Sequence, residues 1–90
     1  MIIEYDDLRK HRGRVAMVDG GFDPLHVGHI EYFNRAQQLG LPLLCNVASG
    51  EYMATKRREF LPEAQRAALI DSIRYVSFTH INQTTTAAIL

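Results

Sequence analysis

The chain has 90 residues, which is enough for one small domain, and 47% of them are apolar while 22% are charged. This composition excludes an intrinsically disordered chain, and a formal net charge of zero argues against a nucleic-acid-binding surface or a membrane-surface role. Cys45 stands alone, so an internal disulfide framework is excluded, and its apolar surroundings predict a buried, inert thiol. No apolar run is long enough to cross a membrane and no signal peptide opens the chain, so we expect a cytoplasmic protein.

The predicted elements alternate between strand and helix. Residues 1–13 form a mixed lead-in, with one helical turn expected after an Asp cap and no assigned chemistry. After it, apolar runs and helical spacings predict a strand at residues 15–18, a helix at 30–39, a strand at 41–48, a loop at 49–61, a helix from Pro62, a strand at 75–81 and a helix start after 84–86. This order predicts an α/β fold on a parallel sheet. Because the last helix has barely begun, we expect the domain, residues 14–90, to be incomplete.

The junction between the first predicted strand and the first predicted helix has the sequence Gly20-Gly21-Phe22-Asp23-Pro24-Leu25-His26-Val27-Gly28-His29. Gly20 and Gly21 allow a tight turn and a close backbone approach to a ligand. The helix start presents unpaired backbone N–H groups and a partial positive charge, which suit a phosphate. His26 and His29 fall on one side of the first turn, and Gly28 leaves space there for a nucleotide. The stretch therefore predicts a site of nucleotidyl transfer.

Two other interpretations of this stretch stay open. A Gly-Gly pair taken alone is more often a simple tight turn than part of a binding site. His26 and His29 also have a spacing that suits zinc ligands, and Asp19 or Asp23 would be the third ligand. A structural zinc site needs four ligands, however, and the chain offers no further His/Cys cluster, so we predict no metal site.

Basic side chains follow the second predicted strand and recur in the helix after it. Residues 56–58, Lys-Arg-Arg, lie at the carboxyl end of that strand, where parallel strands meet at one edge, so we expect this loop and the glycine–histidine stretch to line one crevice. Arg66 opposes the helix dipole at an exposed position, which predicts a ligand or a carboxylate partner. Arg74 lies at a helix end, where its charge is favourable anyway. His11 and His80 are expected to be surface or strand-end side chains.

The stretch from residue 20 to 29 resembles the G-x-F-D-x-x-H-x-G-H signature of the cytidylyltransferase-like nucleotidyltransferases. A second segment, with Arg66 followed by Arg74-Tyr75-Val76, resembles one shared by glycerol-3-phosphate cytidylyltransferase and the nucleotidyltransferase domain of ADP-heptose synthase. The resemblance covers residues 14–90 and implies a Rossmann-like fold with helices on both faces of the sheet. The family's later serine/threonine-rich segment has no counterpart within these 90 residues.

The resemblance also implies a reaction. A phosphate oxygen of a small phosphorylated alcohol or sugar would attack the α-phosphate of CTP or ATP and release pyrophosphate, with Mg²⁺ on the triphosphate. Lys56 and Arg58 compete for the loop contact to phosphate. Homodimers are common in the family, and a non-catalytic nucleotide- or ligand-binding module is the alternative function. The implied catalytic residues are His26, His29 and Lys56, and the implied nucleotide-binding residues are Gly20, Gly21, Phe22, Asp23, Gly28, Arg58 and Arg66.

Overall fold

Three parallel strands form the sheet, in the order β1-β2-β3. The computed structural model of the protein describes residues 1–55 and 59–82. β1 is Ala16–Gly20, β2 is Leu43–Ala48 and β3 is Phe78–Asn82, so each strand lies where an apolar run predicts one, with its ends shifted. The basic residues 56–58 and the predicted helix start after residues 84–86 lie outside the described residues.

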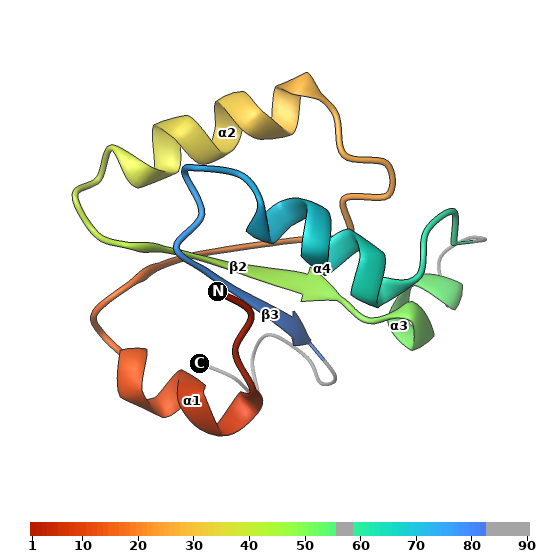
Figure 1. The fold of residues 1–90 in the computed structure, drawn as a ribbon, viewed down its shortest axis with the longest axis horizontal. Helices are drawn as coiled ribbons and strands as arrows, with labels where there is room; N and C mark the ends of the chain where they lie inside the picture. Colours follow the sequence, from red (N-terminus) through yellow and green to blue (C-terminus); the bar gives the residue numbers. More distant parts are fainter. Residues whose placement is uncertain (56–58, 83–90) are drawn as a thin grey trace.

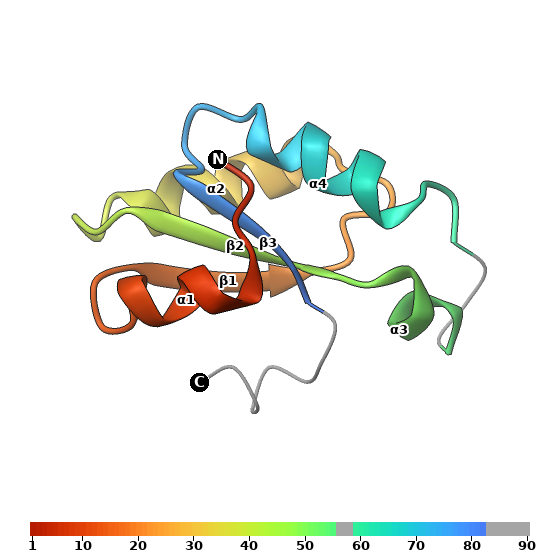
Figure 2. The same ribbon diagram turned by 60° about the horizontal axis from the view of Figure 1, so that its bottom comes forward.

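Helices cover both faces of the sheet. α2 (Val27–Gln37) and α4 (Glu63–Asp71) lie on one face, and α1 (Tyr5–His11) lies on the other, as Figures 1 and 2 show from two directions. Parallel pairing of β1 with β2 and of β2 with β3 requires such crossover connections. The arrangement confirms the predicted Rossmann-like α/β fold. In the described part of the chain, no helix has the length and apolar character needed to cross a bilayer.

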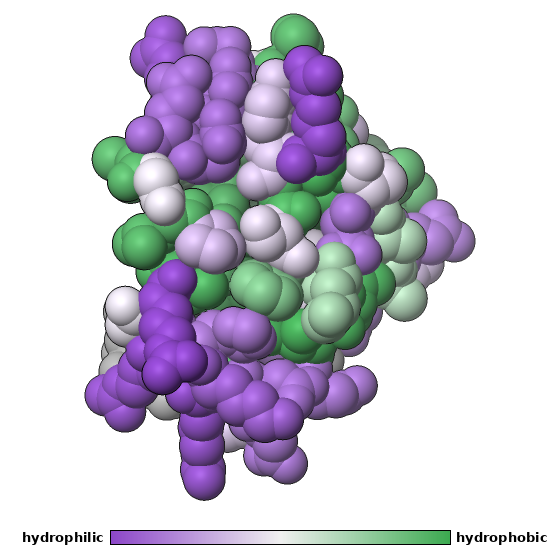
Figure 3. All heavy atoms as spheres, turned by 60° about the vertical axis from the view of Figure 1, so that its left-hand side comes forward, coloured by the Kyte–Doolittle hydropathy of each residue, from purple (hydrophilic) through white to green (hydrophobic). Residues whose placement is uncertain are grey.

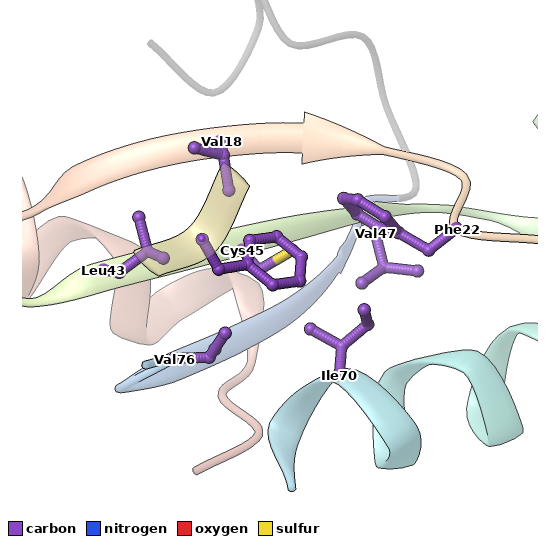
Figure 4. Packing of buried hydrophobic residues seen from close by; sticks show 8 residues of the cluster. Val18, Phe22, Leu43, Cys45, Val47, Ile70 and Val76 are labelled. Atoms are coloured by element: carbon purple, nitrogen blue, oxygen red, sulfur yellow. The ribbon is translucent and has the colours of Figure 1, made fainter. Parts of the chain in front are cut away.

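The core lies between the sheet and the two helices α2 and α4. Cys45 and Val47 of the central strand β2 have no exposed surface, and Phe33 of α2 and Ile70 of α4 belong to the same buried cluster. Figure 4 shows Phe22, beyond the end of β1, reaching into this cluster near Val47. The prediction of a buried cysteine is therefore confirmed, and burial raises the pKa of its thiol.

The N-terminal residues cover the outer edge of β3. The Ile3 N–H donates to the Thr79 carbonyl oxygen at 2.8 Å, and the Thr79 N–H donates to the Met1 carbonyl oxygen at 2.8 Å. α1 follows with seven residues, where the sequence predicts one turn after an Asp cap, and the cap is Glu4, which forms a reciprocal capping box with Asp7. The lead-in segment is therefore part of the fold. Among the described residues, the outer edge of β1 has no strand partner.

Two further parts of the chain differ from what the sequence predicts. The stretch expected to be a loop after β2 contains a short helix, α3 (Gly50–Ala54), because Ser49 Oγ accepts a hydrogen bond from the Tyr52 N–H and caps it. Leu39 lies beyond the end of α2 and is 75% exposed, so it does not belong to the apolar face of that helix.

Figure 3 views the end of the molecule where α2 leads into β2, and hydrophobic surface there separates two hydrophilic regions.

Three polar side chains form a hydrogen-bonded row across the sheet. Asn46 Nδ2 of β2 donates to Asp19 Oδ1 of β1 at 2.9 Å, and Asn46 Oδ1 lies 2.9 Å from His80 Nδ1 of β3. Because an amide oxygen only accepts, His80 Nδ1 carries the hydrogen. His80 is 4% exposed, so the expectation of a surface or strand-end histidine is wrong, and the Asn46 amide is the partner that makes its burial tolerable. The His11 ring packs 4.1 Å from that of Phe78.

His80 is expected to make the stability of the fold depend on pH. Burial lowers the pKa of His80, and the Glu4 carboxylate opposes only part of this effect. Below the ordinary histidine pKa of 6.5 the unfolded chain therefore binds more protons than the folded chain, so the free energy of unfolding falls as the pH falls. Urea unfolding between about pH 7.5 and about pH 5 should show a smaller loss of stability in His80→Gln than in the wild type. Equal losses in both proteins would rule out this role for His80.

Packing of α2 on the sheet predicts that two neighbouring residues of this helix differ in their contribution to the free energy of unfolding. Phe33 has no exposed surface, whereas Tyr32 is 47% exposed. Phe33→Ala should lower the free energy of unfolding by about 3–5 kcal/mol, because it leaves a cavity against the sheet. Tyr32→Ala should cost roughly 0.5 kcal/mol or less, as an exposed position usually does. Similar midpoints for the two variants in urea would mean that α2 does not pack on β2 as described.

Candidate active site

α2 begins with a capping box made of two histidines. The Gly28 N–H donates to His26 Nδ1 at 3.0 Å, and the His26 N–H donates to His29 Nδ1 at 3.1 Å. His26 is the N-cap residue, with an extended backbone, and His29 is the third residue of the helix. The two ring centroids lie 3.9 Å apart, with the ring planes inclined by 30°. The predicted placement of both histidines on one side of the first turn is thus confirmed.

These hydrogen bonds fix the tautomer of both rings. A backbone N–H only donates, so each Nδ1 must offer its lone pair, and the hydrogen of a neutral ring is on Nε2. Burial, with a smaller effect of the nearby His26, lowers the pKa of His29 and so favours its neutral form at pH 7. Each ring is left with Nε2–H as its only N–H donor, beside the positive end of the α2 dipole.

The electrostatics of this helix start favour an anion. α1, α3 and α4 each carry an acidic residue in the first turn, whereas the first turn of α2 carries none. The partial positive charge at the start of α2 is therefore not offset by acidic side chains of its own first turn. Two imidazole N–H donors at such a place suit the oxygen atoms of a phosphate, because the capping box already pairs the backbone N–H groups of His26, Gly28 and His29.

Close contacts explain why the residues on either side of the turn, Gly20 and Gly28, are glycines. A Cβ atom on Gly28 would lie 2.8 Å from Cε1 of the His26 ring, and a Cβ atom on Gly20 would lie 2.6 Å from Cζ of Phe22. Any side chain at either position would displace a neighbouring ring. The space that the sequence predicts beside Gly28 is therefore occupied by the His26 ring of the capping box.

Phe22 connects the core to the second histidine. Its side chain is 6% exposed, its ring centroid lies 5.3 Å from that of Phe33, and it meets the His29 ring edge-on at 5.1 Å. The backbone at Phe22 has φ of 53°, a left-handed conformation that is costly for residues other than glycine. Burial of the ring holds the residue in this conformation, so the position of His29 depends on the core.

Asp23 joins the glycine turn to the segment before α4. Its carboxylate accepts hydrogen bonds from the Phe60 N–H at 2.6 Å and from the Leu61 N–H at 3.0 Å, and the residue is 4% exposed. The chain that leaves β2 therefore returns to the glycine turn, in agreement with the expected convergence of the two strand ends. Lys56 and Arg58, the predicted phosphate contacts in that segment, lie outside the described residues.

Arg66 is buried, so the prediction of an exposed position is wrong. The residue is 1% exposed, and its Nη2 atom lies 2.6 Å from Oε1 of Glu59, so of the two expected partners, a ligand or a carboxylate, the structure shows a carboxylate. Its other nitrogens donate to the backbone carbonyl groups of Gly21, Ala48 and Leu61. No sequence pattern singles out Glu59, because it lies before α4 in a segment with no regular period.

The described residues do not fit the zinc alternative. Backbone N–H groups engage Nδ1 of both His26 and His29, and they also engage the carboxylate of Asp23. Asp19 accepts from the Asn46 side chain. In the ranges that the structure describes, no group of three or more His, Cys, Asp or Glu side chains is arranged to hold a metal ion.

A parallel sheet with a glycine turn after its first strand, leading directly into a helix, defines an α/β protein of the Rossmann-like class. The strand order and the capped start of α2 place this chain in that class. The chain belongs to the cytidylyltransferase-like family, whose model matches residues 17–86, and the predicted resemblance is confirmed.

Named relatives include two FAD synthases. The FAD synthase of Methanoregula boonei is 41% identical over 63 residues, which are 70% of this chain and 43% of that protein. The FAD synthase of Thermococcus kodakarensis is 40% identical over 77 residues, which cover 82% of this chain and 52% of that protein. The chain therefore spans about half the length of these relatives.

Two further matches extend the comparison. The bifunctional protein HldE of Nitratiruptor sp. is 35% identical over 78 residues, which cover 83% of this chain and 17% of that protein. The crystal structure of a lipopolysaccharide core biosynthesis protein from Thermoplasma volcanium matches with a TM-score of 0.71 and 30% identity, over 77% of this chain and 57% of that chain. The likeness to a solved structure supports the Rossmann-like fold described above.

The capping box predicts the imidazole tautomers. Above about pH 7.5, where histidine is mostly neutral, ¹⁵N NMR should show a hydrogen on Nε2 and none on Nδ1 in both His26 and His29. In Gly28→Ala the added carbon would meet the His26 ring at 2.8 Å, so the ring should turn away and its single-tautomer signature should be lost. A hydrogen on Nδ1 of either ring in the wild type would contradict the capping geometry.

Proposed function

We propose that the protein transfers a nucleotidyl group from a nucleoside triphosphate to a small phosphorylated molecule. One observation carries the proposal: the capping bonds of His26 and His29 leave two Nε2–H donors at a helix start whose first turn carries no acidic residue. Nucleotidyl transfer needs positioned donors around an anionic centre and no covalent enzyme intermediate, so such a site suits it. Membership of the cytidylyltransferase-like family supports the same chemistry.

In the proposed reaction, a phosphate oxygen of the acceptor attacks the α-phosphorus atom of the triphosphate. A new P–O bond forms to the acceptor, while the bond from the α-phosphorus to the oxygen that bridges it to the β-phosphate breaks. Pyrophosphate leaves with that oxygen and with the electron pair of the bond. Nε2–H of His26 and Nε2–H of His29 stabilise the negative charge on the phosphate oxygens during this exchange. Lys56 and Arg58 are proposed to add positive charge.

We propose ATP as the nucleotide donor. Two of the named relatives are FAD synthases, and FAD consists of an AMP unit joined to flavin mononucleotide. Their name favours ATP as the donor and flavin mononucleotide as the phosphorylated acceptor. CTP as donor and sugar phosphates as acceptors are the alternatives within the same chemistry, and they are compared directly in the assay below.

The backbone is proposed to make most of the remaining nucleotide contacts. Gly20 and Gly21 have no side chains and the ring of Phe22 is buried, so these residues would contact a nucleotide through backbone N–H groups. Gly28, whose N–H donates to His26 Nδ1, contributes by leaving room for the His26 ring. Asp23 contributes by holding the turn rather than by contacting the nucleotide. Mg²⁺ is proposed to enter with the triphosphate, whose oxygen atoms are good ligands for it. Homodimer formation stays a prediction from the family resemblance.

The proposal predicts a specific pattern of activity. The protein should release pyrophosphate from ATP only when a phosphorylated acceptor is present, with flavin mononucleotide compared with sugar phosphates, and with CTP compared with ATP. His29→Ala should lower kcat/KM by about 10²-fold to 10³-fold, because it removes one donor to the transition state. His11→Ala is the matched control, since His11 packs on Phe78 on the opposite face of the sheet, and its kcat/KM should equal that of the wild type.

Two results would overturn this proposal. Full activity in His29→Ala would remove the imidazole donors from the mechanism. Nucleotide binding without pyrophosphate release, with every donor and acceptor tried, would favour the alternative of a non-catalytic binding module. Isothermal titration with ATP and with CTP separates that alternative from a protein that binds no nucleotide at all.

A further inference from the structure

The peptide group between Gly21 and Phe22 is held from one side by a buried guanidinium. Arg66 Nη1 donates to the Gly21 carbonyl oxygen at 3.0 Å and to the Ala48 carbonyl oxygen at 2.6 Å. Gly21 begins the turn after β1, and Ala48 is the last residue of β2. One side chain of α4 therefore links the carboxyl ends of two neighbouring strands.

The rest of this guanidinium is also engaged by the protein. Nε donates to the Leu61 carbonyl oxygen at 2.9 Å, and Nη2 donates to Glu59 Oε1 at 2.6 Å. The Arg66 side chain has no exposed surface, whereas 26% of the Glu59 side chain is exposed. Hydrogen bonds thus engage all three nitrogen atoms of a side chain that solvent does not reach. Arg66 is therefore built into the protein and does not face a ligand.

The bond to Gly21 determines the direction of a neighbouring donor. In a planar trans peptide the C=O and N–H groups point in opposite directions, so a Gly21 carbonyl aimed at Arg66 turns the Phe22 N–H away from it. Among residues 1–55 and 59–82, no hydrogen bond from the Phe22 N–H is found. The left-handed φ of 53° and the buried ring fix Phe22 on the other side of the same peptide group.

We propose that Arg66 is a positioning residue, which fixes the Gly21–Phe22 peptide so that the Phe22 N–H donates to a phosphate of the nucleotide. The inference rests on the proposed function and deepens it, because it adds a backbone donor to the two imidazole donors. Such a donor needs no reorganisation during the reaction, which is how preorganised N–H groups stabilise developing charge. The Glu59 carboxylate holds the far side of the guanidinium and so supports the same geometry.

Arg66→Lys tests the proposal, because lysine keeps the charge but lacks the planar fork that reaches several acceptors at once. Amide resonances of ¹⁵N-labelled protein are followed while MgATP is added, and pyrophosphate release is measured in parallel. In the wild type the Phe22 amide resonance should move with MgATP. In Arg66→Lys that movement should be lost, and kcat should fall about 10-fold to 10²-fold while KM stays within about 3-fold.

The control is Arg35→Lys, the same substitution on the surface of α2. The Arg35 side chain is 78% exposed and pairs with Glu31 one turn away on the surface of α2, so the substitution should leave the Phe22 response and kcat unchanged. If Arg66→Lys does not fold, Glu59→Gln provides the test, because it removes the charge that holds Nη2 and keeps the three carbonyl contacts. This second variant should show a reduced Phe22 response and a drop of about 3-fold or more in kcat.

The outcomes separate this inference from the proposed function. Pyrophosphate release by a wild type whose Phe22 amide does not respond to MgATP would overturn the role of Arg66 and leave the nucleotidyltransferase in place. Wild-type values of kcat and of the Phe22 response in both Arg66→Lys and Glu59→Gln would also overturn it. A wild type that neither binds a nucleotide nor releases pyrophosphate would refute the proposed function, and the role of Arg66 would fail with it.

Discussion

The pairing of the buried Arg66 guanidinium with Glu59 and three backbone carbonyl groups is the interaction on which the rest of the site depends. A charged guanidinium inside a protein is costly unless every part of it is paired, and removal of one partner leaves a buried charge unpaired. Here the pairing spans the end of β2, the turn after β1, the segment before α4 and α4 itself. The local arrangement of these four segments is therefore specified by a single side chain. Asp23 adds a second, independent link between two of them.

The start of α2 combines two tasks that are usually separate. In an ordinary capping box a serine or threonine and a glutamate satisfy the first backbone N–H groups of a helix. In this chain His26 and His29 fill both positions, so the side chains that cap the first turn of α2 are also the proposed donors to phosphate. Their orientation is set by backbone hydrogen bonds, and His26 holds its place although it is exposed. Backbone hydrogen bonds thus orient both rings, and the contact with buried Phe22 ties His29 to the core as well.

The sequence predicts the elements whose residues repeat with a period, and it predicts the motif at the start of α2. It does not predict α3, because five residues are too few to show a helical period and a single serine caps it. It misplaces His80, because the α1 face of the sheet alternates apolar and polar residues, and only the paired strand shows that Asn46 lies opposite. It also misses Glu59 as the partner of Arg66, since the two meet through a turn of the chain. Regular spacing of apolar residues predicts helices and strands from the sequence, whereas contacts between irregular segments depend on the complete fold.

The row of Asp19, Asn46 and His80 has a consequence for how the strands find each other. Strands of five or six residues have similar apolar side chains along the core face, so slipped pairings would bury nearly the same surface. A slip of one residue would turn Asn46 toward the core, where an amide without partners is costly. A slip of two residues would keep the correct face but separate the three polar groups. The row therefore penalises the competing alignments of β1, β2 and β3, and it does so with groups that add little hydrophobic stability of their own.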